Sequence, residues 1–217
     1  MAPKFTVYTA SDSPNGLKAT LIFEELKAAY PNSVSDLEYE VRTVDINPSG
    51  RIPAVVHHRP DGTDFAVWEP TAILHYLIQR FDPEYKLSFP YQSEFESDSL
   101  QWTVFTHGGV APVQGLVKYF FNNPEEKVPS AINRYLNETK RVYNILDTRL
   151  TGREYLAGPS KGTYSIADIN VFPWVGIHEV VGIKNLDEYT NLKRWFDAIS
   201  GRPAVEAATQ SHPPKSK

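Results

Sequence analysis

Cysteine is absent from this chain of 217 residues. Without cysteine the protein can form no disulfide, no zinc site built on thiolates and no CxxC redox centre. Any thiol chemistry must therefore come from a bound small thiol. A protein without cysteine suits the reducing cytoplasm, where disulfides do not persist, and we expect a cytoplasmic location.

Long apolar runs and a strong net charge are also missing. No segment approaches the length of about 20 apolar residues that a transmembrane helix needs, and the N-terminus lacks the apolar region of a signal peptide. The net charge is −4, so no overall field favours nucleic acid or an anionic membrane. We expect neither as a partner. We also expect no metal, because no ligand spacing such as HxxxH appears and His57 and His58 lie on a predicted surface hairpin.

The first third of the chain alternates between strand and helix patterns. Ser13 and Pro14 form a helix-start signal, with serine at the N-cap and proline in the first turn. The expected order is a strand at 4–8, a helix from 14, a polar loop at 31–36, strands at 37–46, 54–57 and 65–68, and a helix at 73–81. A strand–helix–strand unit implies a parallel crossover, whereas the final hairpin is antiparallel. The pattern therefore predicts a small mixed sheet.

After Phe81 the strand patterns end. Helical stretches follow at 93–121, 130–150, 165–181 and 191–200, with Gly108, Gly109 and Pro112 predicting a kink or a close backbone approach in the first of them. Ser165 and Asp168 have the spacing of a capping box. We therefore expect an α/β domain over 1–82, a linker over 83–92 and an all-helical domain over 93–217.

Several motifs, in order along nearly the whole chain, resemble the cytosolic glutathione S-transferases. They are S-P-N-G-L-K from Ser13, N-P-S-G-R-I-P-A from Asn47, W-E-P-T-A-I from Trp68, S-I-A-D from Ser165 and G-R-P-A from Gly201. The chain looks closest to the bacterial and fungal, Nu-class-like branch that includes the yeast nitrogen-catabolite regulator. The resemblance implies a thioredoxin-like first domain, a helical-bundle second domain, glutathione as substrate or cofactor, and a homodimer.

A glutathione enzyme must favour the thiolate over a thiol whose pKa is near ~8.5. Helix N-termini favour anions through their free N–H groups and dipole, and residues 11–15 lie at such a start. The resemblance points to Asn15 as the residue nearest the thiolate, with Ser13 and Ser11 as weaker candidates and Tyr8 weaker still. The alternative is that Ser13 and Asn15 only cap the helix.

The resemblance also supplies the rest of a glutathione site. Ile52 and Pro53 match the family's cis-proline position, where the backbone pairs with the cysteinyl unit; alternatively, Pro53 begins an edge strand. Arg51 is expected either to reach the glycine carboxylate or to lie solvated. Glu69 resembles the acid that pairs with the γ-glutamyl amine, although it would also suit a helix N-terminus.

Two departures from the family pattern affect this site. Pro70 stands where relatives have serine, and proline supplies neither an N–H nor a hydroxyl to the γ-glutamyl carboxylate. Hydrogen bonds to charged groups contribute roughly 1.5–3 kcal/mol each, so binding would weaken unless Thr71 substitutes. In addition, residues 44–46 lead almost directly into Asn47, without the loop and helix of relatives, while 31–36 look inserted. Both departures predict altered glutathione affinity or a specialised substrate.

The second substrate is expected to be a small hydrophobic electrophile in a cleft between the domains. Its predicted pocket residues are Ser11, Phe105, His107, Tyr119 and Phe120. His107 is a candidate acid–base group or a structural residue, and Trp102 is expected in the core.

Three classes of function remain. The first is a conjugating transferase, which a place in fungal secondary metabolism would suit. The second covers other glutathione-dependent enzymes, namely a cis–trans double-bond isomerase and a disulfide reductase or peroxidase. The third is a non-catalytic regulator, ranked last because the chain lacks an Asn-rich extension.

Overall fold

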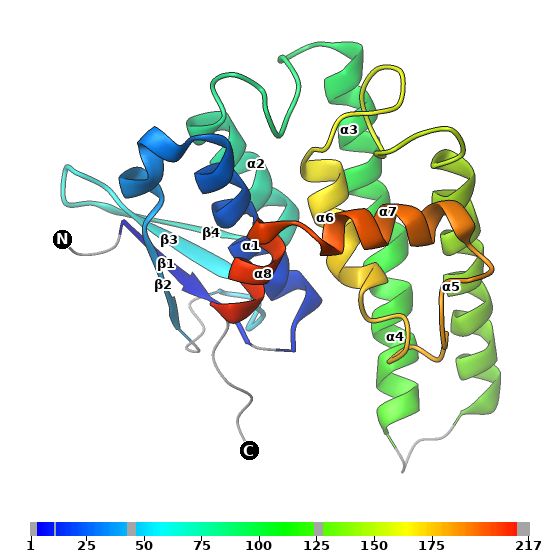
Figure 1. The fold of residues 1–217 in the computed structure, drawn as a ribbon. Coiled ribbons are helices and arrows are strands. Elements are labelled where there is room, and N and C mark those ends of the chain that lie inside the picture. The colour runs from blue at the N-terminus through cyan, green and yellow to red at the C-terminus, as the bar shows by residue number, and fades with distance from the viewer. Residues whose placement is uncertain (1–3, 11, 43–46, 124–127, 212–217) are drawn as a thin grey trace. The chain divides into compact units, whose positions relative to one another are not determined.

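The computed structural model describes residues 4–10, 12–42, 47–123 and 128–211. They form two compact units, one made of Met1–Ser88 with Ser200–Lys217 and the other of Phe89–Ile199. The first unit holds a four-stranded sheet with helices (Figure 1). In the second unit, the described residues form helices and turns but no strand.

The sheet has the strand order β2-β1-β3-β4. Its strands are β1 (Phe5–Tyr8), β2 (Tyr39–Arg42), β3 (Ala54–His58) and β4 (Asp64–Trp68). Strand β1 runs parallel to β2 and antiparallel to β3, and β3 is antiparallel to β4. The predicted mixed sheet is therefore confirmed. Residues 43–46 of the expected second strand lie outside the described residues.

Helices α1 (Pro14–Ala29) and α2 (Pro70–Phe81) cover one face of the sheet. Phe5 of β1 shows this, because its ring lies 5.0 Å from that of Phe23 on α1 and 5.7 Å from that of Phe81 on α2. The expected loop at 31–36 is wrong: a 3₁₀ helix, η1 (Pro31–Leu37), follows α1. Leu37 at its end is fully buried, so the segment is held by core packing that its polar sequence conceals.

A helix that the sequence patterns did not predict, α8 (Pro203–Gln210), packs against α1. Figure 1 shows this red helix beside the blue one. The expected second domain, 93–217, included this segment, whereas the structure groups it with the first unit. An eight-residue helix is too short to be stable alone, so its packing on α1 accounts for its formation.

The segment expected to be a linker begins inside the first unit, which extends to Ser88. The carboxylate of Asp82 holds this stretch by accepting hydrogen bonds from the backbone N–H groups of Lys86 (2.8 Å) and Leu87 (3.0 Å) and from the Ser88 hydroxyl (2.6 Å). Asp82 and Ser88 are both buried. This buried network places 83–88 with the sheet unit.

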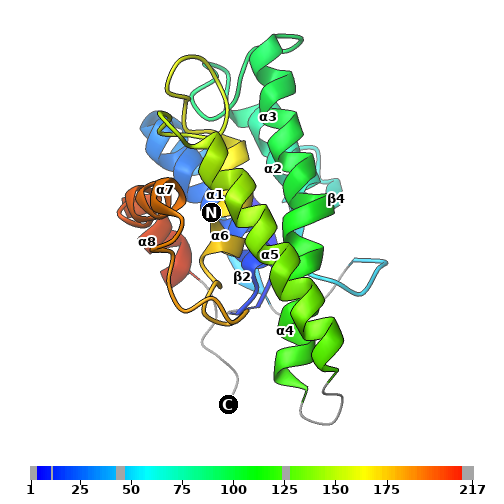
Figure 2. The same ribbon diagram turned by 90° about the vertical axis from the view of Figure 1, so that its right-hand side faces the viewer.

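The second unit contains α3 (Glu94–Phe105), α4 (Ala111–Asn122), α5 (Pro129–Arg149), α6 (Ile166–Val175) and α7 (Thr190–Ser200). Helices α4 and α5 lie side by side (Figure 2). A π-helical turn, η2 (Thr106–Val110), separates α3 from α4, at the Gly108–Gly109 pair where an interruption was expected. Helix α6 ends at Val175, six residues earlier than predicted, and turns follow it. None of the described helices is long and apolar enough to span a membrane.

The predicted capping box at α6 is confirmed. The Ser165 hydroxyl and the Asp168 carboxylate both make the expected capping bonds. Asp168 is fully buried, and its Oδ1 also accepts hydrogen bonds from the Leu156 N–H (3.0 Å) and the Trp195 indole N–H (2.8 Å). Burial raises the pKa of Asp168 to about 6, although these hydrogen bonds lower it. One side chain thus ties the start of α6 to a loop and to α7.

Candidate functional site

The strand register gathers three segments at one end of the sheet. Tyr8, the last residue of β1, pairs with Ala54, the first residue of β3. Ala54 in turn pairs with Trp68, the last residue of β4. Three segments therefore lie at this end of the sheet: the one that follows β1, the one that precedes β3 and the one that follows β4. These segments carry the predicted glutathione-binding residues.

The first segment is the start of α1. The Ser13 hydroxyl accepts a hydrogen bond from the Gly16 N–H at 3.0 Å, and Pro14 occupies the first turn. The predicted cap is thereby confirmed for Ser13. Asn15 follows in that turn and is half-buried, where the first N–H groups of a helix have no partner within it. Ser11 lies outside the described residues.

Gly16 lets α1 approach the end of β1 closely. A Cβ atom at this position would lie 1.8 Å from Thr9 Oγ1 and 3.2 Å from Ser13 Cβ. Any side chain would therefore require the Thr9 side chain to move and its neighbours to shift. The sequence signal was the glycine itself, which is a poor residue for a helix interior.

The second segment, 47–53, enters β3. The peptide bond between Ile52 and Pro53 is cis, as predicted. Asn47, which the sequence analysis gave no role, is buried and builds the turn: its Nδ2 donates to the Arg51 carbonyl at 2.7 Å, and its Oδ1 accepts from the Ser49 N–H at 2.9 Å. The Arg51 side chain is exposed, within reach of an anionic ligand or of solvent.

The third segment links β4 to α2. Glu69 has φ 73°, a left-handed conformation that costs a non-glycine residue about 1–3 kcal/mol and that clusters at functional sites. Glu69 is the N-cap residue of α2, although its side chain makes no capping hydrogen bond there; both the ligand role and the alternative of an acid at a helix N-terminus therefore stay predictions. Pro70 is buried in the first turn, and Thr71 after it is half-buried.

Lys18, the last residue of the S-P-N-G-L-K motif, is a buried residue to which the sequence analysis gave no role. It lies on α1 with only 2% of its surface exposed. Burial lowers the pKa of Lys18 from 10.5 to about 7, and the Glu69 carboxylate opposes this shift. Helix α1 thus carries a buried lysine whose pKa is sensitive to the charge of Glu69 at the start of α2.

The predicted second-substrate residues that the structure describes lie in the second unit. Phe105 ends α3 against Trp102, with ring centroids 5.7 Å apart, and His107 is exposed in the π-helical turn. Tyr119 and Phe120 lie on α4 with their rings 5.2 Å apart, and Tyr119 is half exposed. Trp102, expected in the core, is half-buried, and the Arg149 guanidinium lies over its ring.

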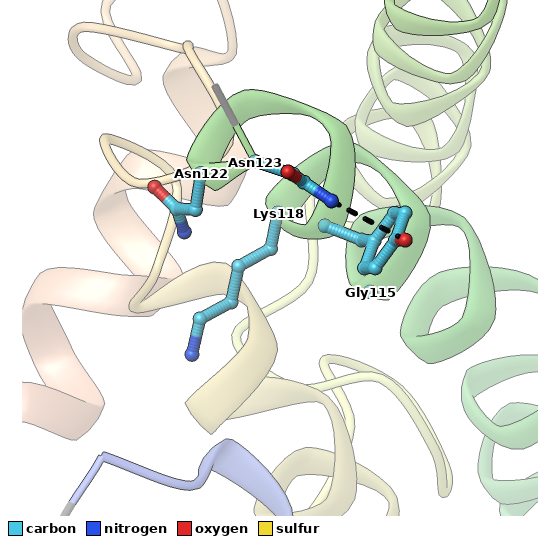
Figure 3. A pocket seen from close by; sticks show the side chains of 5 residues that line it. Gly115, Lys118, Asn122 and Asn123 are labelled. Carbon is cyan, nitrogen blue, oxygen red and sulfur yellow. Dashed lines mark hydrogen bonds between the residues drawn. The ribbon is translucent and has the colours of Figure 1, made fainter. Parts of the chain in front are cut away.

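An open depression of about 430 Å³ adjoins α4 and includes Tyr119. The other residues lining it are Gly115, Lys118, Asn122 and Asn123. Figure 3 shows the Lys118 and Asn122 side chains on the same side of the helix, while Asn123 Nδ2 donates to the Tyr119 hydroxyl at 3.4 Å. Phe105, His107 and Phe120 do not line this depression, so Tyr119 is the only one of the predicted residues described by the structure that does.

The two adjacent histidines are less exposed than expected. His57 Nδ1 lies 2.9 Å from the Tyr76 hydroxyl, and its ring stacks on Phe5 at 4.3 Å. His58 lies between Thr6 Oγ1 (2.8 Å) and Asp64 Oδ1 (2.9 Å). Both histidines are half-buried. In the described ranges, no three His, Cys, Asp or Glu side chains are grouped so as to hold a metal ion.

Comparison with known families covers both halves of the chain. The sequence profile of the glutathione S-transferase N-terminal domain matches residues 3–79. That of the C-terminal domain matches residues 112–203. The two matches fall on the sheet and on the helical part, respectively.

Curated relatives match almost end to end. The glutathione S-transferase-like protein tpcF of Aspergillus fumigatus is 34% identical over 214 residues, covering 93% of this chain and 92% of the relative. The disulfide-bond oxidoreductase YfcG of Escherichia coli is 34% identical over 202 residues, covering 90% of each.

Solved structures show the same architecture. The glutathione transferase URE2P6 of Phanerochaete chrysosporium, in complex with oxidized glutathione, superposes with a TM-score of 0.84 at 32% identity, covering 96% of each chain. A glutathione transferase homolog of Lodderomyces elongisporus, with two glutathione molecules per subunit, gives a TM-score of 0.85 at 28% identity, covering 98% of this chain and 100% of that one. The motifs, both domain profiles and these relatives agree that the chain belongs to the glutathione S-transferase family.

Proposed function

We propose that this protein is a glutathione transferase that uses the glutathione thiolate to attack a small hydrophobic electrophile. The observation that carries the proposal is the convergence of the α1 start, the cis Ile52–Pro53 segment and Glu69 at one end of the sheet. Relatives solved with glutathione share this fold at TM-scores of 0.84–0.85.

In this proposal the thiolate lies at the start of α1. The helix dipole there favours an anion, and the Asn15 side-chain amide donates to the sulfur. Lowering the thiol pKa by two units requires about 2.7 kcal/mol of differential stabilisation, which one charge-assisted hydrogen bond and a helix terminus can supply together. The Ser13 hydroxyl accepts the Gly16 N–H and keeps its own O–H as a donor, so the preference for Asn15 over Ser13 rests on the family motif.

The peptide part of glutathione would lie along the other two segments. The backbone of Ile52, before the cis Pro53, pairs with the cysteinyl unit, and Arg51 receives the glycine carboxylate. Glu69 binds the γ-glutamyl amine. Because Pro70 has no N–H, the hydroxyl and N–H of Thr71 bind the γ-glutamyl carboxylate instead.

The second substrate would contact aromatic side chains of the helical unit. Phe105, Tyr119 and Phe120 offer apolar surface with one phenol, and His107 is exposed on the π-helical turn. These residues suit a hydrophobic molecule with an electrophilic carbon.

A second candidate function is glutathione-dependent disulfide reduction. It is favoured by the 34% identity to a disulfide-bond oxidoreductase. The chain has no cysteine, so the reaction would need two glutathione molecules: one thiolate attacks the disulfide and releases a thiol, and the second cleaves the mixed disulfide to give oxidized glutathione.

Calorimetric titration with glutathione, followed by product analysis, tests these proposals. Transferase activity predicts binding at millimolar glutathione or below and a stable thioether adduct with an electrophile such as 1-chloro-2,4-dinitrobenzene. Disulfide reduction predicts oxidized glutathione as the product, and an isomerase would return glutathione unchanged with a rearranged alkene. No binding at millimolar glutathione refutes all of these enzymatic functions.

We further propose that the protein is a homodimer in the cytoplasm. Strand β4 is an unpaired edge of the sheet in the described residues and exposes Phe65 and Trp68, each more than 40% accessible. Exposed aromatic side chains on a sheet edge are typical of an interface. A monomeric mass by light scattering at micromolar concentration would refute the dimer.

A further inference from the structure

The turn that leads into β3 is built around the side-chain amide of Asn47. Its Oδ1 accepts hydrogen bonds from the Ser49 N–H (2.9 Å) and the Ser49 hydroxyl (3.0 Å), and its Nδ2 donates to the Arg51 carbonyl at 2.7 Å. The orientation of the amide is fixed, because an N–H can only donate and a carbonyl can only accept. The Gly50 N–H donates to the Asn47 carbonyl at 2.8 Å and closes the same turn. Only 8% of Asn47 is exposed, so water competes little for these hydrogen bonds.

The hydrogen bond to the Arg51 carbonyl sets the direction of the next N–H group along the chain. The peptide unit that joins Arg51 to Ile52 is planar and trans, so its carbonyl and its N–H point in opposite directions. Because Asn47 holds the carbonyl, the Ile52 N–H is directed away from the Asn47 side chain. Ala54, two residues further on, is held in the sheet by its pairing with Tyr8. Ile52 is thus fixed by the Asn47 turn before it and by the sheet after it.

We propose that Asn47 is a positioning residue, which holds the peptide unit between Arg51 and Ile52 so that the Ile52 N–H meets the cysteinyl carbonyl of glutathione. This inference rests on the proposed function, in which the Ile52 backbone pairs with the cysteinyl unit. A hydrogen bond weakens steeply when its donor is misdirected. Without the Nδ2 donor of Asn47, this peptide unit rotates about the backbone torsions on either side of it, and the Ile52 N–H loses its fixed direction. In this role Asn47 acts through Ile52 and does not itself contact the ligand.

A comparison of two ligands separates this role from a purely structural one. Calorimetry measures the affinity for glutathione and for an analogue in which an E-alkene replaces the Cys–Gly peptide bond, so that the cysteinyl carbonyl is missing. Asn47→Ser keeps an oxygen that can accept from the Ser49 N–H, Asn47→Ala keeps none, and both lose the donor to the Arg51 carbonyl. Asp61→Ala is the matched control, because Asp61 Oδ1 accepts from the Thr63 N–H (2.9 Å) and the Thr63 hydroxyl (2.6 Å) in a similar turn at the opposite end of β3. Thermal unfolding checks that each variant is folded.

The wild-type protein is expected to bind glutathione more tightly than the alkene analogue. Asn47→Ser and Asn47→Ala each weaken glutathione binding about tenfold and leave binding of the analogue nearly unchanged, whereas Asp61→Ala changes neither. Equal weakening of both ligands, unchanged glutathione binding in the Asn47 variants, or equal affinity of the wild-type protein for the two ligands overturns the role of Asn47. Failure of the wild-type protein to bind glutathione overturns the proposed function instead.

Discussion

Arg202, at the start of α8, forms a two-pronged ion pair with Glu25 of α1. Its Nε donates to Glu25 Oε1 and its Nη2 to Oε2, each at 2.6 Å. Glu25 is 1% exposed, whereas the Arg202 side chain is 32% exposed. The two residues lie 177 positions apart in sequence, so this pair fastens the last described helix to the first.

Replacing Arg202 by alanine is expected to destabilise the protein by about 2 kcal/mol. Breaking a buried pair costs about 3–5 kcal/mol because one charge is left uncompensated, and the partial exposure of Arg202 reduces that figure. The double variant Arg202→Ala/Glu25→Gln is expected to lose less than the sum of the two single variants. Urea unfolding at pH 7 measures the free energy of unfolding of the two single variants and the double variant. If the loss in the double variant equals the sum of the two single losses, the residues do not form a coupled pair.

Lys18 is expected to make stability depend on pH between about 7 and 10. Its pKa is lowered from 10.5 to about 7, so in this window the unfolded chain binds more protons than the folded one. Stability therefore rises with pH relative to Lys18→Met, by at most about 1.4 kcal/mol per unit. Urea unfolding of the wild-type protein and of Lys18→Met at pH 7, 8.5 and 10 measures the difference between their free energies of unfolding. A difference that stays constant over these pH values would show that Lys18 keeps an ordinary pKa in the folded protein.

Asn15 and Ser13 are expected to have different roles, although they lie two residues apart. Asn15→Ala should lower thiol-dependent kcat/KM by about tenfold or more and shift its pH profile upward, because the thiolate loses a donor. Ser13→Ala should cost about 1 kcal/mol of stability through the lost cap and leave the pH profile in place. Thermal unfolding and pH–rate profiles distinguish them, and full turnover by Asn15→Ala would remove it as the thiol activator.

Pro70→Ser is expected to tighten glutathione binding by about tenfold, because serine provides an N–H and a hydroxyl that proline lacks. Thr71→Val, which removes the substitute hydroxyl but keeps the shape, should weaken binding in the wild-type background. Its effect should be smaller when Pro70→Ser is present. Titration with glutathione measures these affinities. A Thr71→Val variant with wild-type affinity would refute the shifted pose.

Local sequence patterns determined the helix caps and the strand arrangement of this protein. The Ser13 cap, the Ser165–Asp168 capping box and the mixed sheet order are confirmed, because caps and strand periodicity depend on residues only a few positions apart. The Gly108–Gly109 interruption was visible for the same reason. The cis peptide at Pro53 and the family itself followed from motifs whose order, taken together, is specific.

Tertiary packing decided what the sequence could not. Helix α8 forms where it packs on α1, and the 3₁₀ helix at 31–37 ends on the buried Leu37. Both segments are too short for a helical repeat to be recognised in the sequence. The roles of Asn47, Lys18 and the Arg202–Glu25 pair were invisible because polar side chains are mostly exposed. Only the fold shows which of them are buried and which distant partners meet them. The sequence thus named the residues of the proposed glutathione site, and only the register of the sheet brought their three segments to one end of it.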